Sequence, residues 1–199
     1  MDARDEELVR RAQDGDRNAV DSLLRRHYDK IRAVVHRIVI NTHDAEDATQ
    51  MALIAIARGI TSFDGQSSLS TWMYRIATNA AIDEVRRIRR RPLPTDDDVQ
   101  LSQMTTDSSE ATVTQMTVIQ ALRELPEEFR TALVLRHVAD LEYEDIAAIQ
   151  NVPVGTVRSR LSRAREQMAR LIADSEGSGQ NGNQSHRGHR QTQHPEDSL

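Results

Sequence analysis

The first residues of chemical interest are arginines and serines that share one face of a predicted helix between positions 156 and 165. An arginine fork can donate two hydrogen bonds to the edge of a guanine, and arginines also bind backbone phosphates. The residues expected to contact duplex DNA are Thr156, Arg158, Ser159, Arg160, Ser162, Arg163 and Arg165. Within this set, Arg160 and Arg165 are assigned to phosphates. The alternative is a solvated charged face on an ordinary helical hairpin.

A helix-turn-helix would position this face. The segments EYEDIAAIQ and GTVRSRLSRAREQMARL, joined by the short turn NVPV, have the proportions of that motif. Its small inward core is predicted to consist of Ile146, Ala147, Val152, Val157 and Leu161. The second helix, predicted from about Thr156 to Ala173, would then present its early exposed turn to a major groove.

A second polar segment, FDGQSSLSTW, leads into a predicted helix that is rich in arginine. Phe63 or Trp72 could stack on or wedge between bases, and the small hydroxyl and amide side chains can bond an unpaired base. Arginines further along the helix can hold the sugar–phosphate backbone. This combination favours single-stranded nucleic acid. The plainer interpretation makes Trp72 and Tyr74 core residues and the arginines a solvated helix end.

Charge is unevenly distributed along the 199 residues, although the net charge is −5. Residues 72–91 carry six arginines against two acidic residues, and residues 152–170 carry five against one, so each segment has a net charge of +4. Residues 92–122 carry five acidic residues and no basic one. Because a single lysine, Lys30, accompanies 25 arginines, anion contacts must use guanidinium groups. Two basic faces therefore flank an acidic connector.

The spacing of apolar residues predicts an all-α protein with two small helical domains. In the first domain, helices are predicted near residues 8–12, 20–38, 45–59 and 71–90, with Asp44 capping the third. The second domain is expected to be a four-helix, winged-helix-like form of the helix-turn-helix. The expected divisions are an N-terminal helical domain at 1–91, a flexible acidic linker at 92–117, a C-terminal helix-turn-helix domain at 118–174 and a disordered tail at 175–199.

Composition excludes several classes of protein. The chain has no cysteine, which excludes a disulfide framework, a cysteine nucleophile, a thiolate zinc site and an iron–sulfur cluster. The longest apolar stretch, Met51 to Ala57, is far shorter than the roughly 20 residues that span a bilayer. The acidic start MDARDEEL also lacks the basic region of a signal peptide. Neither membrane insertion nor secretion is expected.

An enzyme is the weakest interpretation. His43 and Glu46 have the three-residue spacing found in helical metal sites, close to His36, Asp44 and Asp47, but no second pair occurs at a matching place. The sequence also has no glycine-rich phosphate loop, no serine elbow and no zinc signature. We therefore expect no catalytic residue, no metal ligand, no cofactor and no small-molecule substrate.

Together the two polar segments resemble a known family. The segment DAEDATQMALIAIARGITSFDGQSSLSTWMYRIATNAAIDEVRR is followed by LRELPEEFRTALVLRHVADLEYEDIAAIQNVPVGTVRSRLSRAR. Both resemble, in the same order, the bacterial sigma factors of the extracytoplasmic function (ECF) group in the sigma-70 family. The resemblance runs from about Asp5 to Leu171. It implies an initiation factor that binds core RNA polymerase, directs it to promoters and promotes DNA melting.

The resemblance also implies roles for individual residues. The residues implied to bind the clamp helices of the largest polymerase subunit are Asp44, Glu46, Asp47 and Gln50. Those implied to melt or read the −10 element are Phe63, Ser67, Ser68, Leu69, Ser70, Trp72 and Asn79, with Arg75, Arg86 and Arg87 on the backbone. By the same similarity, the face that begins at Thr156 reads the −35 element. For the first group, the plainer interpretation is an acidic first turn that suits the helix dipole.

Further partners follow from the resemblance alone. They are the polymerase flap, promoter DNA and an anti-sigma factor. The implied location of the protein is the cytoplasm, with the nucleoid as its place when it is bound to polymerase. Because anti-sigma factors of this group are often membrane-anchored, such a partner would hold the protein at the membrane. Free members of the group keep their domains packed together, so core polymerase should be required for promoter binding. The main rival is a stand-alone helix-turn-helix regulator that binds duplex DNA as a dimer without polymerase. A third interpretation is an interaction protein whose acidic helix and tail bind partners.

Overall fold

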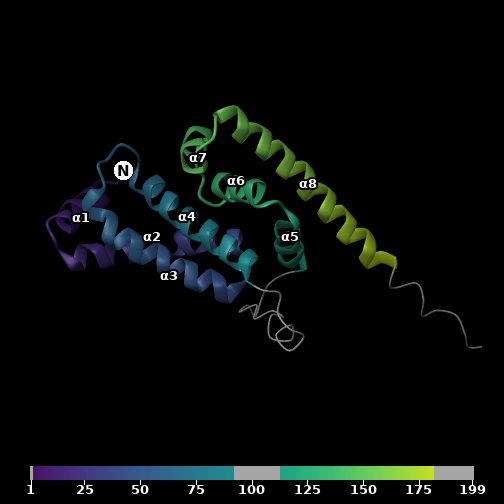
Figure 1. The fold of residues 1–199 in the computed structure, drawn as a ribbon, viewed down its shortest axis with the longest axis horizontal. Coiled ribbons are helices and arrows are strands. Elements are labelled where there is room, and N and C mark those ends of the chain that lie inside the picture. The colour runs from purple at the N-terminus through teal and green to yellow at the C-terminus, as the bar shows by residue number, and fades with distance from the viewer. Residues whose placement is uncertain (1, 92–112, 182–199) are drawn as a thin grey trace, which may run out of the picture.

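The structure is a computed structural model that describes residues 2–91 and 113–181, with residues 113–115 and 176–181 described as backbone only. These ranges contain eight α-helices, one 3-10 turn and no strand (Figure 1). The elements are α1 (Ala3–Gln13), α2 (Arg17–Val39), α3 (Thr42–Gly59), η1 (Ile60–Ser62), α4 (Leu69–Arg90), α5 (Val113–Glu124), α6 (Glu127–His137), α7 (Tyr143–Gln150) and α8 (Val154–Asn181). The all-α prediction is confirmed. Most of the expected linker and the residues after 181 lie outside the described ranges.

The first four helices pack around an aliphatic core. Contacts join α2 to α3 and α4, α3 to α4, and α1 to α2. The buried face of α2 follows the predicted three- and four-residue spacing through Leu23, Ile31, Val34, Val35 and Ile38. Helix α3 contributes mainly alanines to the same core, and α4 contributes Ala77 and Ala81 together with larger side chains such as Leu69 and Met73. These helices therefore form one compact body from residue 3 to residue 90.

The cap of α3 differs from the predicted one. Asn41 is the N-cap, and its side-chain oxygen accepts a hydrogen bond from the backbone N–H of Asp44 at 3.1 Å. The helix begins at Thr42, so Asp44 lies inside the first turn rather than before it. There it is buried, and Arg91 Nη1 lies 2.9 Å from its Oδ1. The prediction that Asp44 caps the helix was wrong, because the amide of Asn41 makes that hydrogen bond and Asp44 pairs with Arg91 instead.

The corner between α2 and α3 holds a strained residue. Ile40 has φ 74° and ψ −50°, and the N–H of Asn41 donates to the carbonyl of Val39 at 3.0 Å, which is a classic γ-turn. A β-branched residue in this region costs about 1–3 kcal/mol. The Ile40 side chain packs against Leu122 and Leu125 of the second domain, and this burial offsets the strain.

The second domain consists of α5 to α8. Ile146, Val157 and Leu161 are fully buried and Ala147 nearly so, which confirms most of the predicted inward core, while Val152 is half-buried. Asn151 ends α7 in the left-handed conformation, as asparagine does more easily than most residues. The turn between α7 and α8 therefore has the helix-turn-helix form that the sequence predicts.

Both ends of this domain extend beyond their predicted positions. Helix α5 begins at Val113 rather than near Val118, and α8 continues to Asn181 although a tail was expected from Ser175. Leu171 of α8 packs against the Leu122 and Leu125 cluster, so that part of α8 is anchored. Adding residues to an existing helix costs less than starting one, so α8 continues for two more turns despite its polar composition.

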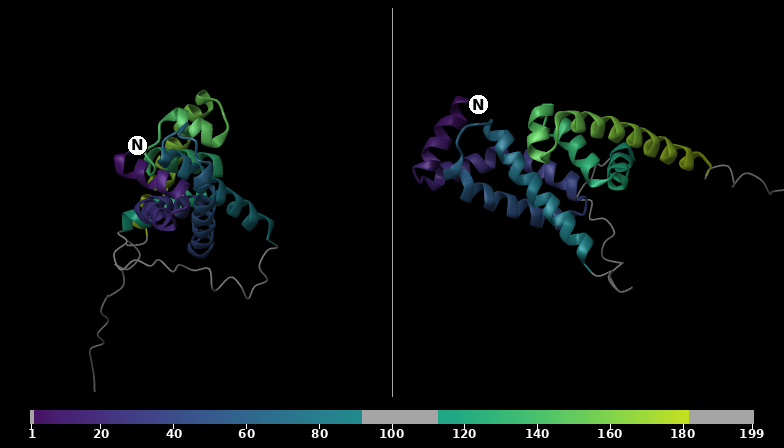
Figure 2. Two further views of the ribbon diagram at one scale, coloured as in Figure 1. Left: turned by 90° about the vertical axis from the view of Figure 1, so that its left-hand side faces the viewer. Right: turned by 45° about the horizontal axis from the view of Figure 1, so that its top comes forward.

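The two domains are packed together (Figures 1 and 2). Helix α2 contacts α6, and α4 contacts α7. Arg89 Nη1 of α4 lies 3.3 Å from Glu127 Oε2 of α6. Apolar side chains from both domains belong to one continuous cluster. The packed arrangement expected from the resemblance is the one that the structure has.

The ion pair between the buried Asp44 and the exposed Arg91 generates a stability prediction. Asp44→Asn keeps the shape of the side chain but removes the charge that faces Arg91, so the free energy of unfolding should fall by about 1–2 kcal/mol. Asp47→Asn, on the exposed side of the same helix, is the matched control and should leave it within about 0.5 kcal/mol. Urea unfolding followed by circular dichroism measures both. Equal effects of the two variants would contradict this account.

Candidate nucleic-acid interface

Helix α8 presents its early residues in two opposite directions. Val157, Leu161 and Ala164 point into the core. Arg158, Ser159, Ser162, Arg163 and Arg165 are exposed. Within the described ranges, no acidic side chain pairs with Arg158 or Arg163. These guanidinium groups are therefore available to a ligand.

Arg160 and Thr156 lie differently from the other members of the predicted set. Both are half-buried. Arg160 Nη1 donates to Gln150 Oε1 at 2.7 Å, and Gln150 Nε2 donates to the carbonyl of Glu128 at 3.3 Å. The carbonyl of Thr156 accepts a hydrogen bond from Ser159 Oγ at 2.9 Å. Arg160 thus ties α8 to α7, and through Gln150 to α6, in addition to any contact with phosphate.

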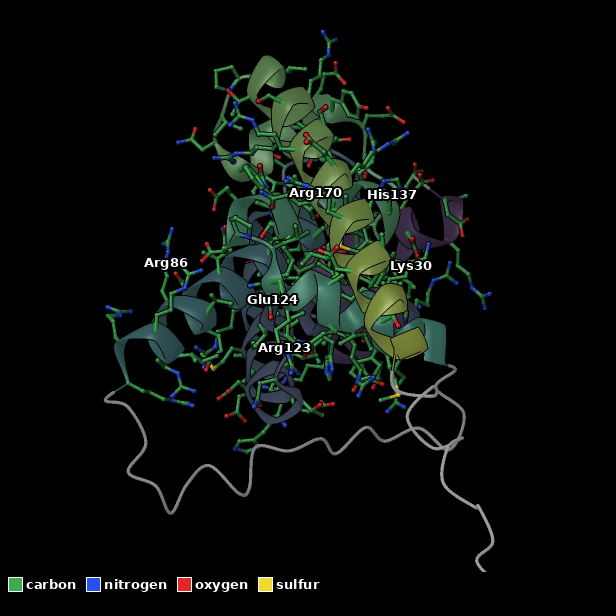
Figure 3. All side chains as sticks on the ribbon, turned by 90° about the vertical axis from the view of Figure 1, so that its right-hand side faces the viewer. Lys30, Arg86, Arg123, Glu124, His137 and Arg170 are labelled. Carbon is green, nitrogen blue, oxygen red and sulfur yellow. The ribbon has the colours of Figure 1, made fainter. Side chains whose placement is uncertain are left out.

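Helix α4 carries a polar stripe at three- and four-residue spacing. Trp72 and Arg75 are half-buried at its start, and Asn79 and Arg86 are exposed further along. Figure 3 shows Arg86 projecting from the side of the body. Since residues with this spacing share one helical face, α4 can hold one nucleic-acid strand along several turns.

Several predicted members of the single-strand set have structural partners instead. The Phe63 ring is only 6% exposed and packs against the Trp72 ring with centroids 5.4 Å apart. Leu69 is buried in the core. Ser68 caps α4, its Oγ accepting from Thr71 N at 3.0 Å, and Arg87 forms two hydrogen bonds with Glu84 at 2.7 and 2.8 Å. Phe63 and Leu69 therefore support the surface from below, whereas Ser68 and Arg87 are exposed but already hydrogen-bonded, and Ser67, Ser70 and Trp72 are half-buried.

The loop before α4 is shaped by its own polar residues. Asp64 Oδ1 accepts from the N–H of Gln66 at 3.1 Å, and Gly65 between them has φ +74°. A side chain is disfavoured at that φ, so glycine is suited to this turn. The turn brings small hydroxyl groups beside the half-buried Trp72. Such a surface can accept an unpaired base by stacking and hydrogen bonding.

The exposed side of α3 combines polar and apolar residues. Asp47 and Gln50 are exposed, as predicted for a contact surface. Met51 and Ile54 lie beside them and are 61% and 44% exposed, which is unusual for side chains of this size. Sequence analysis did not single them out. The sequence feature that could have identified them is their position around the helix, because they lie outside the face formed by the buried alanines of α3.

Glu46 faces α2 rather than solvent alone. Arg32 Nη2 donates to Glu46 Oε1 at 2.7 Å, and His36 Nε2 lies 3.2 Å from the same oxygen. The hydrogen bond from Arg32 lowers the pKa of Glu46, and burial together with the nearby Arg32 lowers the pKa of His36. The charged Glu46 carboxylate is therefore held by Arg32, and this hydrogen-bonded ion pair joins α2 to α3. In the described part of the chain, no three His, Asp or Glu side chains are grouped as metal ligands.

Comparisons with known proteins match both domains. The model of sigma-70 region 2 matches residues 23–91, and the model of sigma-70 region 4 matches residues 115–168. The RNA polymerase sigma-H factor of Pseudomonas aeruginosa is 38% identical over 185 residues, covering 84% of this chain and 93% of the relative. The ECF RNA polymerase sigma-E factor of Haemophilus influenzae is also 38% identical, covering 84% and 95%. The chain belongs to the ECF sigma factors of the sigma-70 family.

Solved structures agree with this assignment. The sigma factor RpoE of Bartonella quintana, solved with the anti-sigma factor NepR, aligns with a TM-score of 0.64 and 26% identity over 77% of this chain and 96% of that one. CnrH, solved with the cytosolic domain of CnrY, aligns with a TM-score of 0.63 and 21% identity over 86% and 98%, and supports the fold. The two-domain sigma fold is therefore confirmed.

The predicted function is also confirmed. This ECF sigma factor directs RNA polymerase to promoter DNA, and polymerase and promoter are its partners. Helices α3 and α4 lie within the region 2 match, and α6 and α7 lie within the region 4 match. Helix α1 precedes both matches. No helix in the described ranges is long and apolar enough to cross a membrane.

Proposed function

We propose that the sigma factor divides its work among three surfaces. The exposed face of α3 binds core polymerase, the loop before α4 and the stripe on α4 melt and hold the −10 element, and α8 reads the −35 element. The observation that carries this division is that each surface is built from exposed side chains on a separate helix, over a shared core. In this proposal the role of the sigma factor is binding alone, with no catalytic residue and no cofactor.

The core-binding surface is Asp47, Gln50, Met51 and Ile54 on α3. An apolar patch with polar neighbours is typical of a protein–protein interface. Of the acidic residues first assigned to it, Asp44 and Glu46 contribute by shaping the first turn of α3, because Arg91 and Arg32 already bind them. The partner proposed for this surface is the clamp of the largest polymerase subunit. The flap is proposed as the partner of the second domain.

Promoter binding requires the two domains to separate. A cavity of about 410 Å3 between them is lined by Asn79 and Arg86 of α4 and by Gln150 and Arg160 of the helix-turn-helix. Residues assigned to the two promoter elements therefore face each other across one gap. Duplex DNA is far larger than this cavity, so it can reach the cavity-facing sides of these four residues only after the domains move apart, although Arg158 and Arg163 are already exposed. We propose that core polymerase causes this separation.

The cell must also restrain the factor. The Bartonella quintana relative was solved with an anti-sigma factor. We propose that an anti-sigma factor binds this chain too, and that the chain is cytoplasmic, nucleoid-associated when bound to polymerase and held at the membrane wherever that partner is anchored. The stand-alone regulator remains the second candidate function. It is favoured only by the free arginines of α8, which would serve either function.

In vitro transcription tests the proposal directly. Purified core polymerase and fragmented genomic DNA of the source organism are incubated with and without the protein, and RNA 5′ ends are sequenced. Discrete starts that share −35 and −10 elements should appear only when protein and core are both present. The protein alone should not retard the same promoter fragments on a gel. No new starts, together with failure to co-elute with core, would favour the stand-alone regulator.

The α3 surface gives a second prediction. The double variant Asp47→Ala, Gln50→Ala should raise the Kd for core polymerase about tenfold or more, since two interface contacts of moderate strength are lost. Asp29→Ala, which removes an exposed charge from α2, is the control. Fluorescence anisotropy of the labelled full chain measures both. Wild-type affinity in the double variant would show that these side chains are ordinary surface.

The α8 surface gives a third prediction. Arg158→Ala and Arg163→Ala should each lower discrimination between the −35 element and its single-base variants by about 1–3 kcal/mol, because a bidentate base contact is lost. Arg170→Ala is the matched control, since Arg170 is exposed later on the same helix and pairs with Glu166. Competitive transcription from mixed promoters gives the discrimination. A uniform loss at all promoters would assign the two arginines to phosphates instead.

A further inference from the structure

Gln13, the last residue of α1, reaches a distant part of the chain. Its Nε2 donates a hydrogen bond to the carbonyl of Phe63 at 2.8 Å and another to the carbonyl of Ile60 at 3.3 Å. These two carbonyls belong to the turn that leads directly into the loop before α4. Helix α1 also packs against η1. One amide thus joins α1 to the start of the proposed −10 loop.

Gln13 makes its two hydrogen bonds where the 3-10 turn η1 ends and the loop begins. The carbonyl of Ile60 already accepts from the N–H of Phe63 at 3.2 Å, which closes the 3-10 turn. The Phe63 carbonyl lies beyond that turn, where the backbone becomes extended with ψ 116°. Because the side-chain amide of glutamine carries two N–H donors, it can hold both carbonyls at once. The direction in which the chain enters the loop is therefore set by Gln13.

The hydrogen bond from Gln13 to the Phe63 carbonyl also affects the position of Trp72. The buried Phe63 ring packs against the Trp72 ring, so the position of the Phe63 main chain determines where Trp72 rests. Trp72 also lies against Gly59, where a β-carbon would be only 3.2 Å from the indole. Contacts with Phe63 and Gly59 therefore restrict the half-buried indole. A change at Gln13 is transmitted through Phe63 to the indole.

Helix α1 is itself firmly placed. Val9 and Ala12 are buried against the core. Arg26 Nε lies 2.9 Å from Asp5 Oδ1, and His27 Nε2 lies 3.2 Å from Asp5 Oδ2, which ties α1 to α2. After Gln13 the chain turns back into α2 with its N–H groups bonded to carbonyls of α1. Gln13 is therefore held on a rigid support.

We propose that Gln13 is a positioning residue for −10 recognition, and that α1 serves as a brace for the base-capturing loop. The inference rests on the proposed function of the loop and of Trp72. It extends the −10 site to a helix that lies before the region 2 match. Gln13 contacts main chain, not DNA, so it acts through the residues that it positions.

The variant Gln13→Glu tests the proposal with little change in shape. A carboxylate has no donor at neutral pH and repels the two carbonyls, so both hydrogen bonds are lost. Gln13→Ala removes them without repulsion. Arg10→Ala is the matched control, because Arg10 lies on the same helix and pairs only with its neighbour Glu7 in the described ranges. Full-length proteins are used throughout.

Two measurements are made on each protein. The first is fluorescence of Trp72, the single tryptophan, in the free chain. Gln13→Glu should shift its emission maximum or change its quenching by iodide, while Arg10→Ala should not. The second is transcription with core polymerase from a promoter and from its single-base −10 and −35 variants. Gln13→Glu should lower discrimination at −10 about fivefold to tenfold, the effect of losing one or two neutral hydrogen bonds. Discrimination at −35 and core affinity should stay at their wild-type values, and the melting temperature should fall by no more than a few degrees.

The outcomes separate this inference from the function on which it rests. If wild-type protein produces no starts, the proposed function fails, and Trp72 fluorescence still tests the contact. If wild-type protein is active but Gln13→Glu keeps its −10 discrimination, the positioning role is overturned. A proportional loss at every promoter, with a lower melting temperature, would also overturn it, because it would show a general role in stability.

Discussion

Small side chains between α3 and α4 are the constraint on which both binding surfaces of the first domain depend. Ala45, Ala48 and Ala52 of α3 and Ala77 and Ala81 of α4 are buried in one core, and the two helices are in contact. Alanine permits close approach of two helices, and such packing resists sliding or rotation because interiors have little free volume. The exposed face of α3 and the polar stripe of α4 are therefore fixed relative to each other. In the proposed division of surfaces, a polymerase bound to the α3 face determines where the α4 stripe meets DNA.

Packing of the two domains sets the order in which these surfaces become available. The α3 surface with Met51 and Ile54 is open, whereas the later part of the α4 stripe faces the second domain. The strained Ile40 lies at the corner that begins α3, and its side chain is the first domain's contribution to the Leu122 cluster. Separation would expose this side chain to water, so its burial against the Leu122 cluster stabilises the packed state. In the proposed opening, free energy from polymerase binding has to exceed that stabilisation, and this requirement would make promoter binding depend on polymerase.

Periodicity predicted the helices well because a buried helical face imposes its spacing on the sequence locally. The core of the helix-turn-helix and the amphipathic α2 are examples. The local sequence pattern does not show which residue pairs with a given charged side chain. Asp44 and Asp47 are both acidic residues near the start of α3, but only Asp44 is paired with Arg91, which returns from the end of α4. Likewise the Ile40 γ-turn contradicts the preference of its residue type, since contacts from the second domain decide it. Gln13 was not found because nothing nearby in sequence marks a contact with residues about fifty positions away.

The same lesson applies to the arginines of α4, whose local charge overstates what is available to DNA. Arg87 is bound by the buried Glu84, and Arg91 by Asp44, so two of the guanidinium groups mainly balance buried carboxylates. Arg89 is paired with an acidic residue of α6 and becomes free only when the domains separate. Each phosphate neutralised contributes about 0.9 to the slope of log affinity against log salt. A count of arginines would thus overestimate that slope for the free chain, and opening adds to it by releasing Arg89. The electrostatic attraction for DNA is in this way linked to the domain separation proposed above.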